Sequence, residues 1–280
     1  MSTSDSNSNC NVAVSKSNDD VCDLIDKLNN MNTEDKDDVV VPVCANCGKD
    51  GANNVCNKCK QVKYCNAACK KKHRNKHKKD CEEHIRLAAE QAAKIHDEKL
   101  FKQPPPKEDC PICFQRLPTL EAGSQYNSCC GKVICSGCDY APVFDNKGNK
   151  VIEELCAFCR IPVPQSDEEV VERIKKRVEI GDSIAMFHLG VNHCLRQHGL
   201  PQDYTKALKL YRQAAELGYD RAYWNIASCD GNGEGVEQDT KMAKQYYELA
   251  AMGGEVMARH NLAVMEEDAG NIHRAIKHYM

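Results

Sequence analysis

Residues 44–81 read CANCGKDGANNVCNKCKQVKYCNAACKKKHRNKHKKDC, and this stretch decides how the front half of the chain folds. Its sulfur and imidazole donors recur at short spacing, which suits metal chelation. Eight such donors fill two closed tetrahedral zinc sites. They form four pairs: Cys44 with Cys47, Cys56 with Cys59, Cys65 with Cys69, and His77 with Cys81.

A second cysteine block runs from Cys110 to Cys159 and again supplies eight donors. The two blocks together therefore predict four zinc ions. A block of about 40 residues buries too little apolar surface to fold unaided. We expect the metal to contribute the missing free energy, on the order of 10–16 kcal/mol per structural site. The pairs of this block are Cys110 with Cys113, Cys129 with Cys130, Cys135 with Cys138, and Cys156 with Cys159.

A disulfide scaffold is the alternative explanation for so many cysteines. The chain has nineteen of them, an odd number, and no apolar run follows Met1 to indicate a secretory signal. Cysteines two residues apart also rarely bridge well. These observations favour zinc and a reducing compartment, the cytosol or nucleus.

We find no apolar stretch of about 20 residues for a membrane span. A net charge of -3 does not indicate a polyanion partner for the whole chain.

The composition divides the chain into five parts. Residues 1–43 are rich in Ser, Asn and Asp and predict a disordered acidic tail. Residues 44–81 hold the first cysteine block. Residues 82–109 form a spacer, with strong helix formers over 82–103 and a proline joint at Pro104–Pro106. Residues 110–164 hold the second block, and residues 165–280 carry a repeat.

The repeat has a period of 36 or 37 residues. Ala185, Ala222 and Ala258 are 37 and 36 apart, and Asp203 and Asp239 are 36 apart. Such a period is typical of stacked helical hairpins. The step from Ala243 to Ala275 is only 32, which predicts a third connection four residues shorter. We expect a first helix over about 167–180 with a capping box from Ser166 to Glu169, and an unpaired face at Ile276 and Tyr279.

The repeat resembles the Sel-one-like repeat, a relative of the tetratricopeptide repeat, through GEGVEQDTKMAKQYYELAAMGG and HGLPQDYTKALKLYRQAAELGY. The first block resembles a MYND zinc finger through YCNAACKKKHRNKHKKDC. Both resemblances imply protein-interaction modules. The fold class is then small zinc-stabilised cross-brace modules followed by an all-α helical-hairpin solenoid. By the MYND resemblance one zinc is held by Cys44, Cys47, Cys65 and Cys69, and the other by Cys56, Cys59, His77 and Cys81.

Two positions of the first block bear on its peptide-binding surface and on its choice of ligands. Arg74 stands where the MYND family usually has an aromatic residue, which bears on the shape of its peptide-binding surface. His73 is a rival ligand to His77, because it follows Cys69 by four residues. We favour His77 for its spacing to Cys81 and interpret His73 as a solvated surface side chain.

The second block resembles a RING finger through CPICFQRLP, CCGKVICSGC and CAFCRIPVP. Lys132 stands where that family has a ligating histidine, and a lysine ammonium cannot bind zinc. The resemblance then implies that Cys129 and Cys130 both ligate; in the alternative, one is a free buried thiol. It also implies contact with a ubiquitin-conjugating enzyme through Ile112, Arg160 and Pro162. By the family's interleaving, the zinc ligands are Cys110, Cys113, Cys135 and Cys138 for one ion and Cys129, Cys130, Cys156 and Cys159 for the other.

Three functions remain open on the sequence. The first is a non-enzymatic adaptor that binds protein partners through the finger and the repeats. The second is a RING-type ubiquitin ligase whose repeats select substrates. The third is a nucleic-acid regulator that uses the basic run Lys70–Lys79, which we disfavour because aromatic residues for base stacking are nearly absent there.

Overall fold

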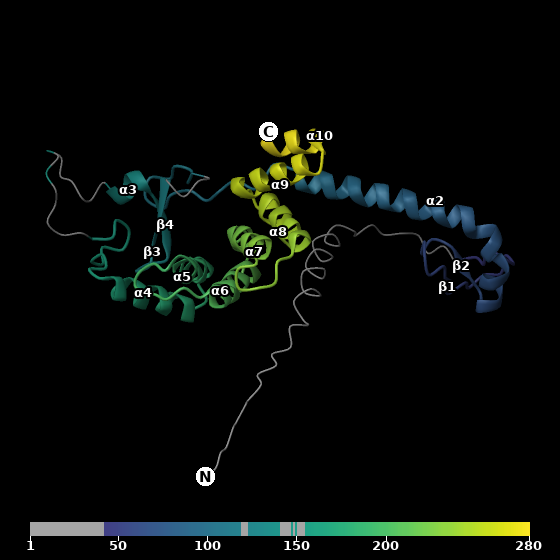
Figure 1. Ribbon diagram of the computed structural model, residues 1–280, viewed down its shortest axis with the longest axis horizontal. Coiled ribbons are helices and arrows are strands. Elements are labelled where there is room, and N and C mark those ends of the chain that lie inside the picture. The colour runs from purple at the N-terminus through teal and green to yellow at the C-terminus, as the bar shows by residue number, and fades with distance from the viewer. Residues whose placement is uncertain (1–41, 119–122, 141–146, 148, 150–154) are drawn as a thin grey trace, which may run out of the picture. The chain divides into compact units, whose positions relative to one another are not determined.

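The computed structural model describes residues 42–118, 123–140, 147, 149 and 155–280 (Figure 1). The chain divides into two compact units, Met1–His96 and Asp97–Met280. The predicted acidic tail lies outside the described residues up to position 41. Among the described residues, none of the helices combines the length and the apolar character needed to cross a bilayer.

The first unit is built around a short hairpin and a long helix. Strands β1 (Asn54–Val55) and β2 (Lys63–Tyr64) pair antiparallel, and α2 runs over Ala67–Leu100. The helix predicted over 82–103 is thus the continuation of the finger's own helix, and it ends at Leu100. Its middle, residues 86–94, is exposed on every side, and ion pairs from Arg86 to Glu83 and Glu90 lie along it.

The second unit begins with a hairpin and a short helix in the second cysteine module (residues 110–164). Strands β3 (Ser124–Asn127) and β4 (Lys132–Cys135) pair antiparallel, with Tyr126 opposite Val133. Helix α3 (Ser136–Tyr140) follows directly. The small core of this module contains Cys110, Leu117 and Ile134.

Helix α4 (Asp167–Glu179) leads into the repeats. It begins at the predicted cap, because the Ser166 hydroxyl accepts a 3.2 Å hydrogen bond from the Glu169 backbone N–H. The Glu169 carboxylate reaches back one residue further than a capping box requires, to the N–H of Gln165 at 2.9 Å.

Three helical hairpins then pack side by side (Figure 1). The connection in the last hairpin, 269–271, is four residues shorter than the one at 233–239, as the shortened period predicts. Ile276 and Tyr279 are half exposed on the last helix. The helices are α5 (Ser183–Leu195), α6 (Tyr204–Glu216), α7 (Arg221–Asn232), α8 (Thr240–Met252), α9 (Val256–Asp268) and α10 (Ile272–Tyr279).

The repeated residues have identifiable roles in these hairpins. Asp203 and Asp239 cap α6 and α8 by accepting hydrogen bonds from backbone N–H groups one turn in. Ala185, Ala222 and Ala258 are fully buried. Gly190 lets two helices approach closely, since a Cβ there would lie 2.6 Å from the Tyr211 ring. Small residues therefore set the helix spacing, and rings fill the space beside them.

Candidate metal centres

The sixteen donors singled out in the sequence lie in four groups. Within each group the donor atoms are all within 4.8 Å of one another. This is the interleaved grouping that the two family resemblances imply, and ligation by each residue stays a prediction. The groups are Cys44, Cys47, Cys65 and Cys69; Cys56, Cys59, His77 and Cys81; Cys110, Cys113, Cys135 and Cys138; and Cys129, Cys130, Cys156 and Cys159.

The separations between donors fit zinc. Four sulfurs at about 2.3 Å from one tetrahedral ion lie about 3.8 Å apart. Cys47 and Cys65 are 3.6 Å apart, and Cys113 and Cys135 are also 3.6 Å apart. All seventeen described cysteines are free thiols, so these contacts are not disulfides. This donor chemistry supports zinc binding.

Four of the Cys-x2-Cys pairs lie in turns of one type. In each turn the backbone N–H four residues after the first cysteine donates to that cysteine's carbonyl, as from Gly48 to Cys44 at 2.8 Å. The donating residue has a left-handed backbone: Gly48, Lys60, Phe114 or Arg160. A pair of antiparallel residues closes each turn, for example Val43 with Asp50 and Asp109 with Arg116. The same local geometry therefore recurs in both cysteine blocks.

This turn favours a thiolate at its first cysteine. Burial opposes ionisation of Cys44, but backbone N–H groups of Cys65, Asn46 and Cys47 outweigh it and lower the pKa of the thiol to about 6. Burial is likewise outweighed by backbone donors at Cys56 and Cys110, where the pKa also falls to about 6. Each of these turns thus offers one thiolate at neutral pH, the form that binds metal.

The thiols of Cys65 and Cys81 hold their protons more tightly. Hydrogen bonds to Cys69 and Cys47 raise the pKa of Cys65 to about 12. Burial, followed by contacts with Cys56 and Cys59, raises the pKa of Cys81 to about 11. A divalent cation supplies the positive charge that four clustered thiolates require, so metal binding should release protons.

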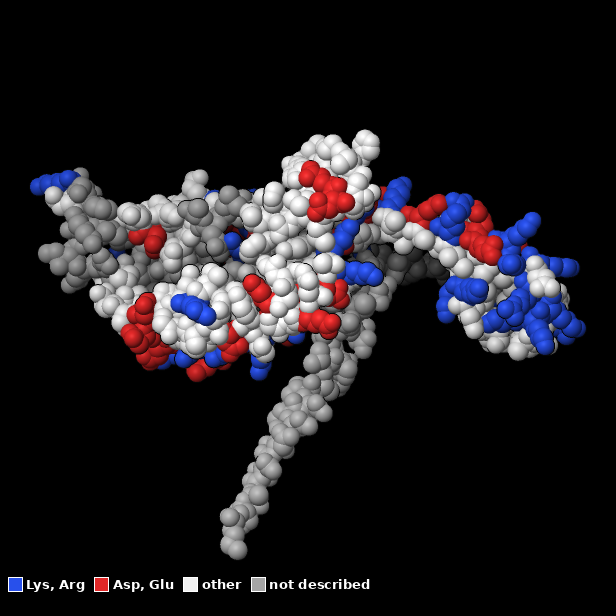
Figure 2. Space-filling view, viewed as in Figure 1, with Lys and Arg blue, Asp and Glu red and all other residues white. Residues whose placement is uncertain are grey.

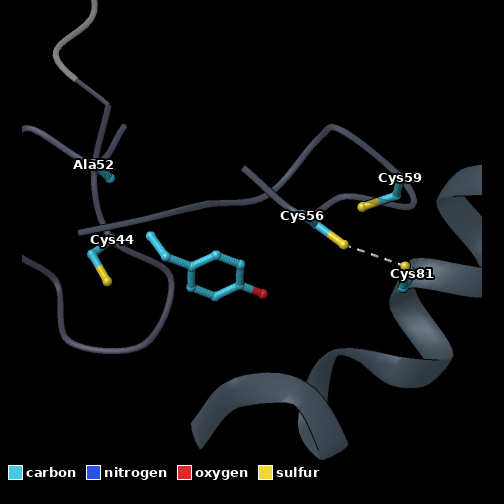
Figure 3. Packing of buried hydrophobic residues seen from close by; sticks show 6 residues of the cluster. Cys44, Ala52, Cys56, Cys59 and Cys81 are labelled. Atoms are coloured by element: carbon cyan, nitrogen blue, oxygen red, sulfur yellow. Dashed lines mark hydrogen bonds between the residues drawn. The ribbon is translucent and has the colours of Figure 1, made fainter. Parts of the chain in front are cut away.

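His77 and His73 have different surroundings. His77 is buried, and its Nε2 lies 3.4 Å from Cys59 Sγ. His73 lies outside the group, and its Nδ1 is 3.3 Å from the hydroxyl of buried Tyr64. The interpretation of His73 as a solvated side chain is wrong, because it stacks on His77 and is half buried. Figure 3 shows the cysteines and Ala52 that pack in this core.

Cys65 and Cys69 lie on either side of the start of α2, so they do not share a helix face. Cys65 precedes α2, which begins at Ala67. Asn66 caps the helix, since its side-chain oxygen accepts a 2.9 Å hydrogen bond from the Cys69 N–H. The first turn of α2 then brings the two sulfurs within 3.5 Å.

The adjacent cysteines Cys129 and Cys130 lie in the turn between β3 and β4. Cys129 Sγ is 3.4 Å from Cys159 Sγ, and Cys130 Sγ is 3.9 Å from Cys156 Sγ. Gly131, with φ +71°, completes the turn and donates to the Asn127 carbonyl at 2.8 Å. A tight hairpin turn can therefore present both sulfurs to one site.

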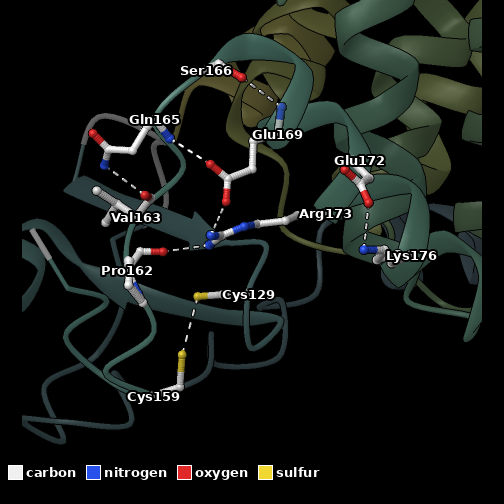
Figure 4. Close-up of polar contacts among 10 residues, drawn as sticks. All are labelled: Cys129, Cys159, Pro162, Val163, Gln165, Ser166, Glu169, Glu172, Arg173 and Lys176. Carbon is white, nitrogen blue, oxygen red and sulfur yellow. Dashed lines mark hydrogen bonds and ion pairs between the residues drawn. The ribbon is translucent and has the colours of Figure 1, made fainter.

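The second module is attached to α4 (Figure 4). Arg173 donates to the Pro162 carbonyl at 2.7 Å and also pairs with Glu169. Arg177 pairs with Asp182 at 2.8 Å. A Cβ on Gly131 would lie 1.7 Å from Arg177 Nη2, so the turn with the two cysteines lies directly beneath that guanidinium. No sequence pattern indicates this attachment.

Two family models match the chain, one over the first cysteine block and one over the helical repeats. Residues 44–81 match the family model of the MYND finger, and residues 183–219 and 220–255 match the Sel1 repeat. The chain carries a MYND finger and two Sel1 repeats. These modules generally bind other proteins.

Individual relatives match only parts of the chain. Chitin synthase regulatory factor 2 of Schizosaccharomyces pombe is 38% identical over 60 residues, 21% of this chain and 12% of the relative. The chain thus spans a small part of that relative's length. A Sel1 repeat protein from Oxalobacter formigenes is 28% identical with a TM-score of 0.38, covering 40% of this chain and 47% of that one. A protective antigen of uropathogenic Escherichia coli with an SLR fold is 31% identical with a TM-score of 0.36, covering 39% and 24%.

Proposed function

We propose that this chain is a non-enzymatic adaptor that binds partner proteins at its MYND finger and along its Sel1 repeats. The observation that carries the proposal is that each of the four donor groups already contains four protein donors. The chain also carries two kinds of interaction module, the MYND finger and the Sel1 repeats. A site with four protein donors has no open position for an activated water or a substrate. The zinc ions, four in our proposal, then hold the fold together.

The MYND finger offers a groove of about 540 Å³ beside α2. The charged side chains of its walls are mainly basic: Lys58, Lys71, Arg74 and Lys78 line it, and Glu82 is the one acidic lining residue. Lys70 is held in the fold instead, because it donates to the Val55 carbonyl and the Asn57 side chain at 2.7 Å each. Figure 2 shows Lys and Arg side chains gathered over the finger. We infer an acidic segment of a partner protein as the occupant.

A labelled acidic peptide tests this inference by fluorescence polarisation with the full chain. We expect Arg74→Glu to weaken binding by about tenfold at low salt, since it reverses one charge in the groove. Lys94→Glu, on the exposed part of the same helix, is the control and should change affinity little. Equal weakening by both variants would reject the groove. Tighter binding of a short DNA duplex than of the peptide would make nucleic acid the partner instead.

A ubiquitin-ligase function is the second candidate, and exposed apolar side chains in the second module favour it. Phe114 is 77% exposed, and Ile112, Phe158 and Ile161 are also exposed, all in or beside the two Cys-x2-Cys turns. Such side chains are typical of interaction surfaces. Of the contact residues that the RING resemblance implies, Ile112 and Pro162 are exposed, and Arg160 takes the left-handed position of its turn.

An autoubiquitination assay with a panel of conjugating enzymes separates the two candidates. If the chain is a ligase, Ile112→Ala should abolish ubiquitin transfer while leaving zinc content unchanged. Ile180→Ala, exposed at the end of α4, is the control. Absence of transfer with every enzyme leaves the adaptor function.

A further inference from the structure

A pocket of about 410 Å³ lies where the second cysteine module meets the repeats. The β3–β4 hairpin forms one wall, and helices α5 and α7 form the others. Tyr126 of the hairpin stacks on His188 of α5 with ring centroids 4.9 Å apart. The pocket therefore depends on this docking and would not exist in the repeats alone.

The walls of this pocket are aromatic and almost uncharged. Tyr126, Phe187, His188, Tyr219 and Trp224 all line it. Burial, with Arg221 nearby, lowers the pKa of His188 to about 4, so the imidazole is neutral. Arg221 is the one ionised lining residue, and it lies over the Phe187 ring and 3.6 Å from Glu255. A ligand for such walls carries no charge of its own.

Amide side chains supply the polar part of the lining. Gln125, Gln197 and Asn225 reach the pocket from the hairpin, from the end of α5 and from α7. Each amide offers both a donor and an acceptor. Aromatic walls with a few such groups are how extended proline-rich segments are recognised, because their carbonyls stay available for hydrogen bonding.

The chain's own proline joint shows that the neighbouring surface accepts this conformation. Over residues 101–109, Phe101, Pro104 and Lys107 are partly buried and the residues between them are exposed. This period of three is that of a polyproline II helix. One face of the segment thus lies against the repeats.

Each step of three residues meets a different part of the repeats. The Phe101 ring is 4.7 Å from the His278 ring of α10. Pro104 covers Gly254, where a Cβ would lie 2.9 Å from the proline Cβ. Lys107 acts on Asp220, where its charge opposes the rise in pKa caused by burial. A rise of about 3.1 Å per residue gives about 9 Å per step, close to the spacing of packed helices.

The pocket continues this surface beyond Asp220, because Tyr219 and Arg221 on either side of that residue line it. We propose that the pocket binds an extended, proline-containing segment of a partner protein in the polyproline II conformation. This inference rests on the proposed adaptor function and names one class of partner for the repeats.

Trp224 is the single tryptophan of the chain and lines the pocket, so its fluorescence reports binding there. The probe is an N-acetylated, C-amidated decaproline, titrated to millimolar concentration into the zinc-loaded full chain. A blocked Gly-Ser decapeptide is the negative control. We expect a saturable change in Trp224 emission with decaproline alone.

Two exposed leucines provide matched variants. Leu195 lines the pocket and is 60% exposed, and Leu217, outside it, is 55% exposed. Leu195→Ala should weaken decaproline binding by about fivefold through lost apolar contact, and Leu217→Ala should not. Equal effects of the two variants, or no saturable change in emission, would overturn the proposal.

Calorimetry on the same samples separates this proposal from the adaptor function. Heat of binding without a change in Trp224 emission would place decaproline elsewhere on the chain and reject the pocket. The acidic-peptide experiment at the MYND finger would then still decide the adaptor function by itself.

Discussion

Tyr126 donates a 2.9 Å hydrogen bond to the carboxylate of Asp182, 56 residues away along the chain. The same carboxylate caps α5 by accepting from the backbone N–H groups of Ile184 and Ala185, and it binds Arg177. Asp182 thus joins the second cysteine module, the end of α4 and the start of the repeats. These contacts join the second cysteine module and the helical repeats, each of which has its own core, into one unit.

Tyr126→Phe should destabilise this unit by about 1 to 2 kcal/mol, because a buried hydrogen bond to a charged group is lost while the carboxylate keeps its other donors. Chemical denaturation followed by circular dichroism measures the change. Tyr140→Phe, at an exposed tyrosine of the same module, should change the free energy of unfolding less than Tyr126→Phe does. An unchanged midpoint for Tyr126→Phe would show that the hydrogen bond does not hold the modules together.

Gly131→Ala should be considerably more destabilising than Gly199→Ala. Both glycines have φ +71°, so the backbone strain of about 1 kcal/mol is common to the two variants. A Cβ at Gly199 meets nothing within 4 Å, whereas one at Gly131 displaces Arg177 from Asp182. We expect an additional loss of about 1 to 3 kcal/mol at Gly131. Equal losses in thermal denaturation would contradict the docked turn.

Native mass spectrometry of the intact chain should find four zinc ions. Cys130→Ser should lower the count to three, because it removes one of the four donors of the fourth group. Cys194→Ser is the control, since Cys194 lies outside all four groups. A count of three in the unmodified chain would rule out joint ligation by Cys129 and Cys130.

Chelation should unfold the two cysteine modules and spare the helical repeats, whose core contains no metal donor group. Titration with a zinc chelator, followed by hydrogen exchange, would resolve the two regions. Loss of protection in α6 to α9 together with the modules would contradict this expectation. Proton release on zinc binding should accompany the reverse experiment, because thiols such as Cys65 must ionise.

Stability of the repeats should fall as pH rises through about 6. Asp230 in α7 is 6% exposed, and burial raises the pKa of its carboxyl to about 6. Its folded-state pKa lies above the unfolded value, so the carboxyl group contributes stability at low pH that is lost once it ionises. Asp230→Asn should therefore stabilise the repeats by on the order of 2 kcal/mol at pH 8 and by about half as much at pH 5.

Denaturation at the two pH values gives the comparison, and Asp268→Asn at an exposed site of α9 is the control. A stabilisation of the same size at both pH values would assign the effect to packing and not to ionisation.

Much of the architecture could be predicted because its signals are local. The Cys-x2-Cys turns need only a few consecutive residues, so their spacing shows them directly. The register of the hairpins follows from alanines and aspartates that recur with the helical repeat, and the short third connection follows from the shortened period. Each of these features is decided within about one repeat length of chain.

Other features do not follow from the spacing of the cysteines. Cys65 lies before α2 because Asn66 caps that helix, and His73 is held by Tyr64 across the finger. Neither contact follows from spacing. Arg177, Gly131 and Tyr126 each look ordinary in the sequence and acquire their roles only by meeting Asp182.

The amino-acid sequence by itself determined the short cysteine pairs and the period of the helical repeat, because both patterns act between near neighbours, and the grouping of donors around each proposed zinc was implied by the two family resemblances. Only the tertiary structure decided that the second module docks on the first repeat, that the proline joint lies along the hairpins, and that an aromatic pocket forms between them. Those contacts join distant segments through side chains of common types, and complementary surfaces can be recognised only once both have folded.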